Sequence, residues 1–490
     1  MSSEKEGGRK RKQSGIQSSQ HKKTEPCPMA ESSTTSSNNG SSPITRIPQD
    51  HLFSILLLLP VESILSFAMT CKKLKSLAYS DSLWESICKR DWGQTPVDSI
   101  KGSNHLQQLP WKRLYQQVYQ LDSVFCRRLL VESPDGDGIL PSPRASHSLN
   151  LVSGFLVLFG GGCEGGRHLD DTWIAYIGNN FRTTLKWQKI NSGIPSGRFG
   201  HSCVVIGDSL VLFGGINDLG IRQNDTWIGQ VTVHEKLGIT FSWRLLDIGP
   251  IASSPPPRGA HAGCCIENKR MLIHGGIGLS GVRLGDTWVL NLSEDLYLGT
   301  WREITAQPSP PPRSGHSLTH IGGSQTILFG GRGTGFEVLN DVWILDASEG
   351  RWRWSQLLFE IRNVPQGFSL PRVGHSASLI IGRRLLIYGG EDSYRNRKDD
   401  FWVLDISSMS CLKMQGRSVN ENRTYRRMWR KLESKGEKLN CRSFHGACVD
   451  DSGRYLYVYG GMVDGLVQPA DPSGLRFDGE SFLLELVMQS

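Results

Sequence analysis

An Arg-x-x-His pattern recurs six times along this chain, and each copy is followed by an apolar run that ends in Gly-Gly. The six pairs are Arg144/His147, Arg198/His201, Arg258/His261, Arg313/His316, Arg372/His375 and Arg442/His445. In the first five copies a tryptophan lies 13 residues after the first glycine, whereas the sixth copy has Phe482, 22 residues after Gly460. A pattern repeated in this way predicts a row of equivalent structural units instead of one large core.

Each repeat is about 60 residues long, which suits four short strands joined by loops. The histidine marks strand a, the apolar run before Gly-Gly strand b, the tryptophan strand c, and a second aromatic residue strand d. Run 156–159 is continuously apolar, as expected of a strand covered on both faces. Four-stranded units can pack face to face in a ring, which protects their edges. We therefore predict a mainly β fold, a six-bladed propeller.

The last repeat is too short to complete its own blade. Eight residues follow Phe482, fewer than a further loop and a strand d would need. Residues 125–130, upstream of the first repeat, resemble residues 241–246, which are assigned to a strand d. We expect this N-terminal segment to supply the missing outer strand and to close the ring.

The N-terminal part differs from the repeats in composition and in the spacing of its apolar residues. Residues 1–43 are rich in serine and contain almost no side chains that could fill a core, which predicts a disordered tail. Its basic run 9–12 is either a nuclear import signal or a solvated charge run. Residues 44–93 show helical spacing of apolar side chains, with Asp81 expected to cap one helix, and residues 94–123 form a helical linker. The propeller is then expected over residues 124–490.

Composition excludes several classes of protein. The 11 cysteines include no C-x-x-C and no secretory signal opens the chain, so we expect reduced thiols and a location in nucleus or cytoplasm. The longest apolar run, Leu52 to Pro60, is too short to span a membrane. The net charge of +8 is concentrated in residues 1–43 and 411–440, so a nucleic-acid partner is not expected. Stretch 411–440 is either a solvated insertion or a site for RNA or an acidic peptide.

Two sets of motifs resemble known families. The Gly-Gly pairs and five Asp-x-Trp copies, such as Asp171-Thr172-Trp173, resemble kelch repeats over residues 143–490. Residues 44–93 resemble an F-box, with Ile47-Pro48 where the family usually has Leu-Pro. The order of the two is similar to plant F-box/kelch proteins, some of which also carry a light-sensing flavin domain. Residues 1–43 leave no room for such a domain, so light sensing is not expected.

The resemblance implies a substrate receptor of an SCF-type ubiquitin ligase. The F-box would bind a Skp-type adaptor, and through it a cullin, while the propeller would hold the protein to be ubiquitinated. The resemblance implies that the adaptor-binding residues are Ile47, Pro48, Leu52, Ile55, Leu59, Pro60 and Ile64. Such a receptor needs no catalytic residue, metal or cofactor of its own, because it acts by proximity.

The alternatives are a ligase-independent kelch scaffold and an enzyme built on a propeller. No Glu-x-x-x-Asp-x-x-x-His spacing, typical of iron-dependent specifier proteins, occurs in the sequence. The repeated arginines and histidines are expected to serve the scaffold, since one copy per blade is typical of structural hydrogen bonding.

The loops between strands b and c are the predicted substrate-binding surface. They have constant length in five repeats but varied polar and aromatic contents, as a rigid recognition surface requires. The predicted contact residues, suited to an acidic or phosphorylated segment, are Arg167, His168, Arg222, Arg283, Arg332, Phe336, Tyr394 and Arg395. The opposite face, with the insertion around 411–426, is the alternative.

Overall fold

The computed structural model describes residues 43–102, 109–133, 138–178, 183–234, 238–249, 253–357, 370–406, 429–464 and 475–488. The predicted tail, apart from residue 43, and the basic stretch 411–426 lie outside these ranges. The chain divides into two compact units, residues 1–52 and 53–490. This division falls at neither of the boundaries expected at 43/44 and 93/94, which stay predictions.

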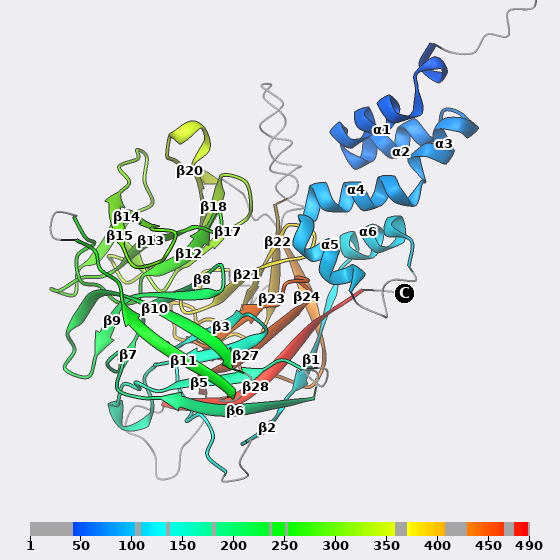
Figure 1. The fold of residues 1–490 in the computed structure, drawn as a ribbon. Helices are drawn as coiled ribbons and strands as arrows, with labels where there is room; N and C mark the ends of the chain where they lie inside the picture. The colour runs from blue at the N-terminus through cyan, green and yellow to red at the C-terminus, as the bar shows by residue number, and fades with distance from the viewer. Residues whose placement is uncertain are drawn as a thin grey trace, which may run out of the picture. The chain divides into compact units, whose positions relative to one another are not determined.

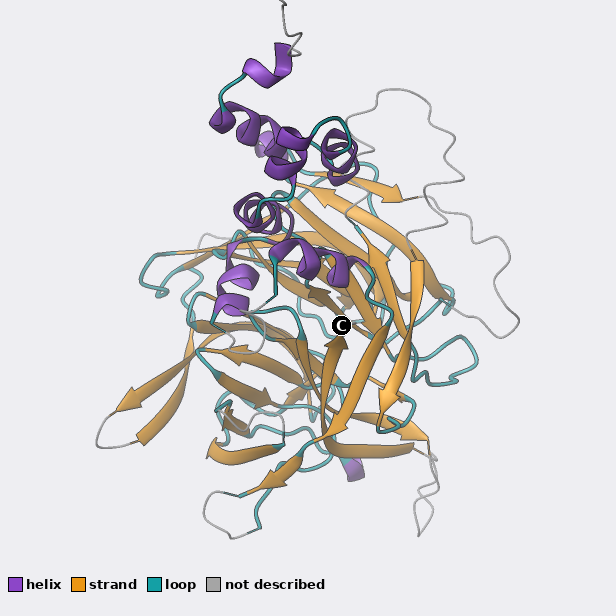
Figure 2. Cartoon of the chain, turned by 90° about the vertical axis from the view of Figure 1, so that its right-hand side faces the viewer, coloured by secondary structure: helices purple, strands orange, loops and turns teal. Residues whose placement is uncertain are grey.

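The N-terminal part is helical, as its apolar spacing indicates (Figures 1 and 2). A short 3-10 helix, η1 (Pro43–Arg46), comes first. The helices are α1 (Gln49–Leu58), α2 (Val61–Ala68), α3 (Lys72–Ala78), α4 (Asp81–Trp92), α5 (Gln94–Lys101) and α6 (Trp111–Tyr119). Each of α2, α3, α4 and α6 buries residues at spacings of three or four, so each has one apolar face.

One expectation about these helices is wrong. Asp81 begins α4 but makes no capping hydrogen bond there, and the N-cap position is Ser80. Its carboxylate accepts a hydrogen bond from the backbone N–H of Trp111, at 2.6 Å, the first residue of α6. Asp81 therefore satisfies an orphan donor of another helix, which sequence spacing within α4 cannot indicate.

The first five repeats form four-stranded antiparallel blades, with strands a to d in chain order. In blades 2 and 4, two short strands share the innermost place. The strands are β3 (Ser148–Val152), β4 (Phe155–Phe159), β5 (Thr172–Tyr176) and β6 (Thr184–Asn191) in blade 1; β7 (Arg198–Phe199), β8 (Ser202–Ile206), β9 (Ser209–Asn217), β10 (Arg222–His234) and β11 (Gly238–Leu245) in blade 2; β12 (Ala262–Ile266), β13 (Arg270–Ile277), β14 (Arg283–Leu292) and β15 (Gly299–Glu303) in blade 3; β16 (Arg313–Ser314), β17 (Ser317–His320), β18 (Gln325–Gly333), β19 (Val338–Asp346) and β20 (Arg353–Leu357) in blade 4; and β21 (Ser376–Ile380), β22 (Arg384–Tyr388), β23 (Phe401–Asp405) and β24 (Trp429–Gly436) in blade 5.

Blade 6 takes its outer strand from the N-terminal segment, as predicted. Its own strands are β25 (Arg442–Ser443), β26 (Gly446–Val449), β27 (Tyr455–Asp464) and β28 (Leu475–Val487). Strand β1 (Ser123–Arg128) pairs antiparallel with β28 and also parallel with β24 of blade 5, so the two blades form one continuous sheet. Strand β2 (Leu130–Glu132) then pairs parallel with β6 of blade 1. The segment 123–132 therefore joins three blades, a wider connection than the sequence predicted.

The ring closes around its axis. Each innermost strand contacts the innermost strands of the blades before and after it, in the cycle β3, β8, β12, β17, β21, β26 and back to β3. Six backbone hydrogen bonds follow the same cycle: Ser146 N to Phe444 O (2.8 Å), Gly200 N to Ser146 O (2.8 Å), Ala260 N to Gly200 O (2.7 Å), Gly315 N to Ala260 O (2.9 Å), Gly374 N to Gly315 O (2.9 Å) and Phe444 N to Gly374 O (2.6 Å). We call these six bonds the axial ring. They establish a closed six-bladed propeller.

The repeated arginines hold the blades together internally. In blade 1 the buried Arg144 guanidinium donates to both carboxylate oxygens of Asp171, at 2.6 and 3.0 Å, and to the carbonyl of Gly160, at 3.1 Å. The indole N–H of Trp173 donates to the same carboxylate, at 2.7 Å. Burial opposes ionisation of Asp171, but these bonds outweigh it and lower its pKa. Blades 2 to 5 repeat this arrangement with Asp225, Asp286, Asp341 and Asp400.

The repeated histidines join neighbouring blades. His201 bonds the hydroxyl of Ser148 in the previous blade, and the equivalent pairs are His261–Ser202, His375–Ser317 and His445–Ser376. Ala262 and Gly446 stand where the remaining two serines would be. The ring nitrogens of His316 and His147, which face those positions, have no hydrogen-bond partner in the described part of the chain. The expected scaffold role of Arg-x-x-His is therefore confirmed.

The Gly-Gly pairs permit this close packing. Both glycines of blade 1 have positive φ, 67° at Gly160 and 100° at Gly161. A Cβ on Gly160 would lie 2.7 Å from the carbonyl oxygen of Arg198 in blade 2, and one on Gly161 would lie 2.8 Å from the Cβ of His147. Glycine is required here because any side chain would meet the next strand or its own histidine.

Candidate functional site

The residues predicted to bind an adaptor have unequal exposure. Ile55 and Pro60 are exposed, and Leu59 is half-buried. Leu52 and Ile64 are buried, with 2% and 0% of their surface exposed, so their side chains serve the interior and are not a contact surface in this conformation. Ile47 is half-buried and Pro48 exposed. The role of the seven residues in adaptor binding stays a prediction, because helical spacing alone does not distinguish a buried apolar face from an exposed one.

Of the exposed apolar side chains of α1 and α2, only Ile55 was in the predicted set. Leu58 is 84% exposed and Met69, the C-cap residue of α2, is 80% exposed, and Ile55 and Leu65 are also exposed. Ile55 and Leu58 share one face of α1, and Leu65 and Met69 are four residues apart. We call these four residues the apolar F-box surface. Apolar side chains with this exposure indicate contact with a partner.

The b–c loops of blades 1 to 5 leave the same edge of every sheet, because each follows the end of strand b. On this edge neighbouring loops bind each other. In blade 1 the backbone N–H of His168 donates to Asp218 of blade 2, at 2.6 Å, and the His168 ring packs on Phe199. His168 is therefore held as a bridge between loops, while Arg167 beside it is exposed.

The loops of blades 3 to 6 are joined by arginines. Arg283 donates to the Ser314 hydroxyl and lies over the ring of Phe336, 4.5 Å from its centroid. Arg332 pairs with Glu391 of blade 5, at 3.3 Å, and Arg397 lies 3.9 Å from the same carboxylate. We call Arg283, Arg332, Glu391 and Arg397 the loop collar. The structure thus brings the predicted Arg283, Arg332 and Phe336 together with Glu391, a carboxylate missing from the predicted set.

The loop collar carries more positive than negative charge. Partial burial, and next the nearby Arg332, lower the pKa of Arg283, so the two guanidinium groups repel each other. The Nε atoms of Arg222 and Arg332 are buried and lack a hydrogen-bond partner among the described residues. Arg222 donates through another nitrogen to the carbonyl of Gly220 in its own loop. The Arg332 Nε in the collar and the Arg222 Nε in the neighbouring blade 2 loop are thus donors without an acceptor among the described residues.

Around the collar, the loop tips expose apolar side chains. Tyr394 is 86% exposed and Leu219 is 81% exposed, and the other exposed apolar residues are Ile221, Leu279, Val282 and Phe336. Arg395, also predicted, is exposed beside Tyr394 and adopts a positive φ of 62°. The prediction found the arginines and aromatic residues but missed the aliphatic tips. Aliphatic residues in the b–c loops of blades 2 and 3, such as Leu219 and Leu279, are the sequence signal that could have indicated these tips.

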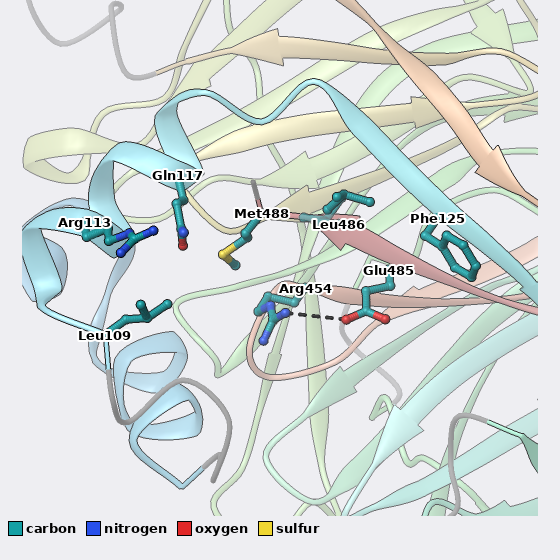
Figure 3. A pocket seen from close by; sticks show the side chains of 9 residues that line it. Leu109, Arg113, Gln117, Phe125, Arg454, Glu485, Leu486 and Met488 are labelled. Carbon is teal, nitrogen blue, oxygen red and sulfur yellow. Dashed lines mark ion pairs between the residues drawn. The ribbon is translucent and has the colours of Figure 1, made fainter. Parts of the chain in front are cut away.

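A pocket of about 370 Å³ lies between α6 and the outer edge of blade 6 (Figure 3). Arg113 and Gln117 project from α6, and Arg454 and Glu485 from blade 6, where they pair at 3.6 Å. Leu109, Phe125, Leu486, Val487 and Met488 complete the lining. The side of α6 toward blade 6 is therefore loosely packed.

The described residues contain neither a cluster of metal ligands nor a membrane-spanning helix. Within the ranges given above, no three His, Cys, Asp or Glu side chains are grouped as a metal would require. None of the helices in those ranges is long and apolar enough to cross a membrane.

The fold and the two surfaces define a class of protein, an F-box joined to a kelch propeller. The F-box-like family model matches residues 44–90, and the model described as the KLHDC2/KLHL20/DRC7 Kelch-repeats domain matches residues 112–294 and 239–410. An F-box/kelch-repeat protein of Arabidopsis thaliana is 58% identical over 465 residues, which cover 93% of this chain and 95% of that protein. This chain belongs to the F-box/kelch-repeat family.

More distant relatives are similar over a smaller share of the chain. Adagio-like protein 1 of rice, Oryza sativa subsp. japonica, is 29% identical over 72% of this chain and 54% of its own length. Adagio protein 3 of Arabidopsis thaliana is 27% identical over 83% of this chain and 60% of its own length. The chain therefore spans little more than half of these two proteins.

Proposed function

We propose that this protein is the substrate-recognition subunit of an SCF-type ubiquitin ligase. The observation that carries the proposal is the presence of two protein-binding surfaces on one chain, the apolar F-box surface and the b–c loop edge of the propeller. The F-box binds a Skp-type adaptor and the propeller binds the protein to be ubiquitinated. The chain itself is non-catalytic and raises the concentration of substrate lysines near a separate conjugating enzyme.

The adaptor contact is tested by charges on the apolar F-box surface. Leu58→Asp with Met69→Asp should abolish co-purification with a Skp-type adaptor, because the charges would be buried in the interface. Both side chains are at least 80% exposed in the free chain, so folding should not change. Leu219→Asp, at an equally exposed propeller residue, is the matched control. Binding by the double variant would show that the adaptor contacts another surface, and no binding by the natural chain would favour the ligase-independent scaffold.

We place substrate binding on the b–c loop edge. The unused arginine donors of the b–c loops suit carboxylates or phosphates, and the apolar tips suit aliphatic or aromatic neighbours of that acidic group. The substrate class is therefore a segment that combines an acidic group with apolar side chains.

Capture from cells tests this surface. The Leu58→Asp/Met69→Asp chain should act as a trap that binds substrates without delivering them. This trap should no longer capture substrate proteins when it also carries Arg167→Glu, Tyr394→Ala and Arg395→Glu. It should still capture them when it carries Arg302→Glu, at an exposed position of the outer strand β15. Capture that survives the loop changes and is lost on removing residues 411–426 would assign recognition to the basic insertion.

A further inference from the structure

A series of side-chain contacts runs from the end of α1 to blade 5. It begins at Arg90 of α4, whose guanidinium donates to the carbonyl oxygens of Leu57 and Leu59, both at 2.8 Å. The same guanidinium pairs with Asp91 at 2.7 Å. Arg90 thus satisfies carbonyls at the C-terminal end of α1, which otherwise lack intrahelical donors.

The next contacts join α4 to α6. Asp91 accepts a hydrogen bond from the hydroxyl of Tyr115, at 2.9 Å. The Tyr115 ring stacks on Trp92, with 5.5 Å between centroids, and meets Trp84 edge to face at 5.3 Å. With the bond from Trp111 N to Asp81, α6 is held against α4 at its beginning and its middle. These aromatic contacts restrict rotation of α6 because large rings on both sides fix its face.

The last contacts join α6 to the propeller. Arg384 of β22 donates to the carbonyl oxygens of Val118 and Tyr119 at the C-terminal end of α6, and it pairs with Asp405 of β23 at 3.4 Å. Only 3% of this side chain is exposed. Leu114 and Val118 of α6 belong to one apolar cluster that includes Ile380, Ile381 and Leu386 of blade 5 and Leu456, Leu484 and Leu486 of blade 6.

The two sides of α6 differ. Toward blade 5 it is bonded and packed, whereas toward blade 6 it leaves the pocket of Figure 3, in which the side-chain Oε1 of Gln117 is buried without a hydrogen-bond partner among the described residues. Both blades contribute to the apolar cluster under α6, whereas the hydrogen bonds to its C-terminal carbonyls come from Arg384 of blade 5.

We propose that Arg90, Asp91, Tyr115 and Arg384, named here the clasp, are positioning residues for ubiquitin transfer. The clasp makes helices α2 to α6 and the propeller one rigid body. Because the adaptor binds at the helices and the substrate binds at the propeller, the substrate lysines then stay at a constant distance from the conjugating enzyme. This inference rests on the proposed function. A loose connection would still bind adaptor and substrate, but it would lower the effective concentration of the lysines.

Blade 3 provides a matched control for Arg384. Arg270 stands at the same place in its blade: it pairs in register with Ile266 and Asn291 as Arg384 pairs with Ile380 and Asp405. Its guanidinium pairs with Glu267, at 2.6 Å, and 25% of the side chain is exposed. A change at Arg270 removes the same charge from the same strand position without touching α6.

The first measurement needs neither adaptor nor substrate. Spin labels carried by unnatural amino acids at the exposed positions Lys72 and Tyr394 report the distance between the helices and the loop edge in the full chain. We expect one narrow distribution in the natural chain and in Arg270→Met, and a distribution about twice as wide in Arg384→Met. Tyr115→Phe, which removes one hydroxyl only, should broaden it less. Equal widths in all four chains would overturn the inference.

The second measurement connects the clasp to transfer. With the substrate found by the trap, Arg384→Met should retain adaptor and substrate binding but lose ubiquitin transfer by about tenfold, while Arg270→Met should not. Arg384→Lys should restore transfer only in part, because an ammonium cannot span two carbonyls as the planar guanidinium does. Unchanged transfer with a broadened distance would refute the positioning role. Failure of the natural chain to bind an adaptor would refute the proposed function instead, leaving the rigidity result standing.

Discussion

Blades 1 to 5 and blade 6 solve the same packing problem in different ways. Each of the first five is made from one continuous segment and carries the full arginine, aspartate and tryptophan set. Blade 6 borrows β1, which begins at Ser123, 352 residues before β28 begins at Leu475. Its Arg442 lies 2.9 Å from Asp478, outside hydrogen-bonding geometry, and Phe482 replaces tryptophan. The difference teaches that the closing blade depends on distant chain segments, whereas the others depend on local signature residues.

Removing the borrowed strand should have the largest effect. Deletion of residues 1–131 exposes the edges of β28 and β24, so this chain should aggregate or lose its cooperative thermal transition. Deletion of residues 1–109 retains β1 and α6 and should leave a soluble propeller. Equal melting temperatures of the two chains would show that blade 6 stands without β1.

Unfolding at acid pH tests whether blade 6 unfolds together with the other five blades. Burial, and next a nearby arginine, lowers the pKa of His201 and of His375 to about 3, and the pKa values of His147, His261, His316 and His445 are also lowered. Unfolded histidine binds a proton below about pH 6.5, while the folded rings stay neutral. The unfolded state therefore binds more protons, and stability is full above pH 6.5 and falls as the pH approaches 3.

The limiting slope is about 1.4 kcal/mol per pH unit for each histidine. Thermal melts between pH 7 and 5 should show one transition that moves to lower temperature, since closure couples the blades. Two transitions would mean that blade 6 separates first, and a constant melting temperature would contradict the burial of the histidines.

The arginines of blades 3 and 6 sharpen the comparison at single residues. The buried Arg258 donates to both oxygens of the half-buried Asp286, at 2.8 and 2.7 Å, so Arg258→Met should cost about 3–5 kcal/mol by removing both charged hydrogen bonds from this carboxylate. Arg442 has one guanidinium nitrogen without a hydrogen-bond partner in the described residues, so Arg442→Met should cost only about 2 kcal/mol. Urea unfolding of both variants measures this difference, and equal costs would remove the distinction between the blades.

The smallest effect concerns the histidine partners between blades. Ser317→Ala should cost about 1–2 kcal/mol, because His375 loses its bond of 2.9 Å. Ala262→Ser should gain about 1 kcal/mol by giving His316 the partner that the other blades provide. Denaturant unfolding measures the change in the free energy of unfolding of both variants. A loss of stability in Ala262→Ser would indicate that the added hydroxyl does not reach His316.

Much of this fold was predictable because its signals are local and repeated. Arg144, Gly160 and Trp173 occur at spacings that recur in later blades, and residues 125–130 resemble a known outer strand. The parallel pairing of β1 with β24 and of β2 with β6 was not predictable, since parallel partners distant in sequence leave no periodic pattern. The contact of Arg384 with α6 was not predictable either, because Arg270 occupies the equivalent position of its own repeat and does not contact α6.

The site residues were predictable in kind but not in their partners. Loop arginines and aromatics such as Arg332 and Tyr394 could be found from constant loop length and varied content. Their contacts could not, because the distance from Arg332 to Glu391 depends on how closely two blades pack. Burial of Leu52 and Ile64 was missed for a related reason, since helical spacing does not distinguish an interior face from one that binds a partner.

The axial ring has an electrostatic consequence. In a helix the peptide dipoles align and leave partial charges at the two ends. The six bonds of the axial ring point one after another around a circle, with each N–H directed to the preceding blade, so they have no first donor and no last acceptor. Their dipoles circulate and largely cancel, and no terminal charge arises there. The axial ring therefore adds no net charge to the potential over the loop edge, and loop substitutions can reverse the sign of that potential without opposition from this part of the backbone.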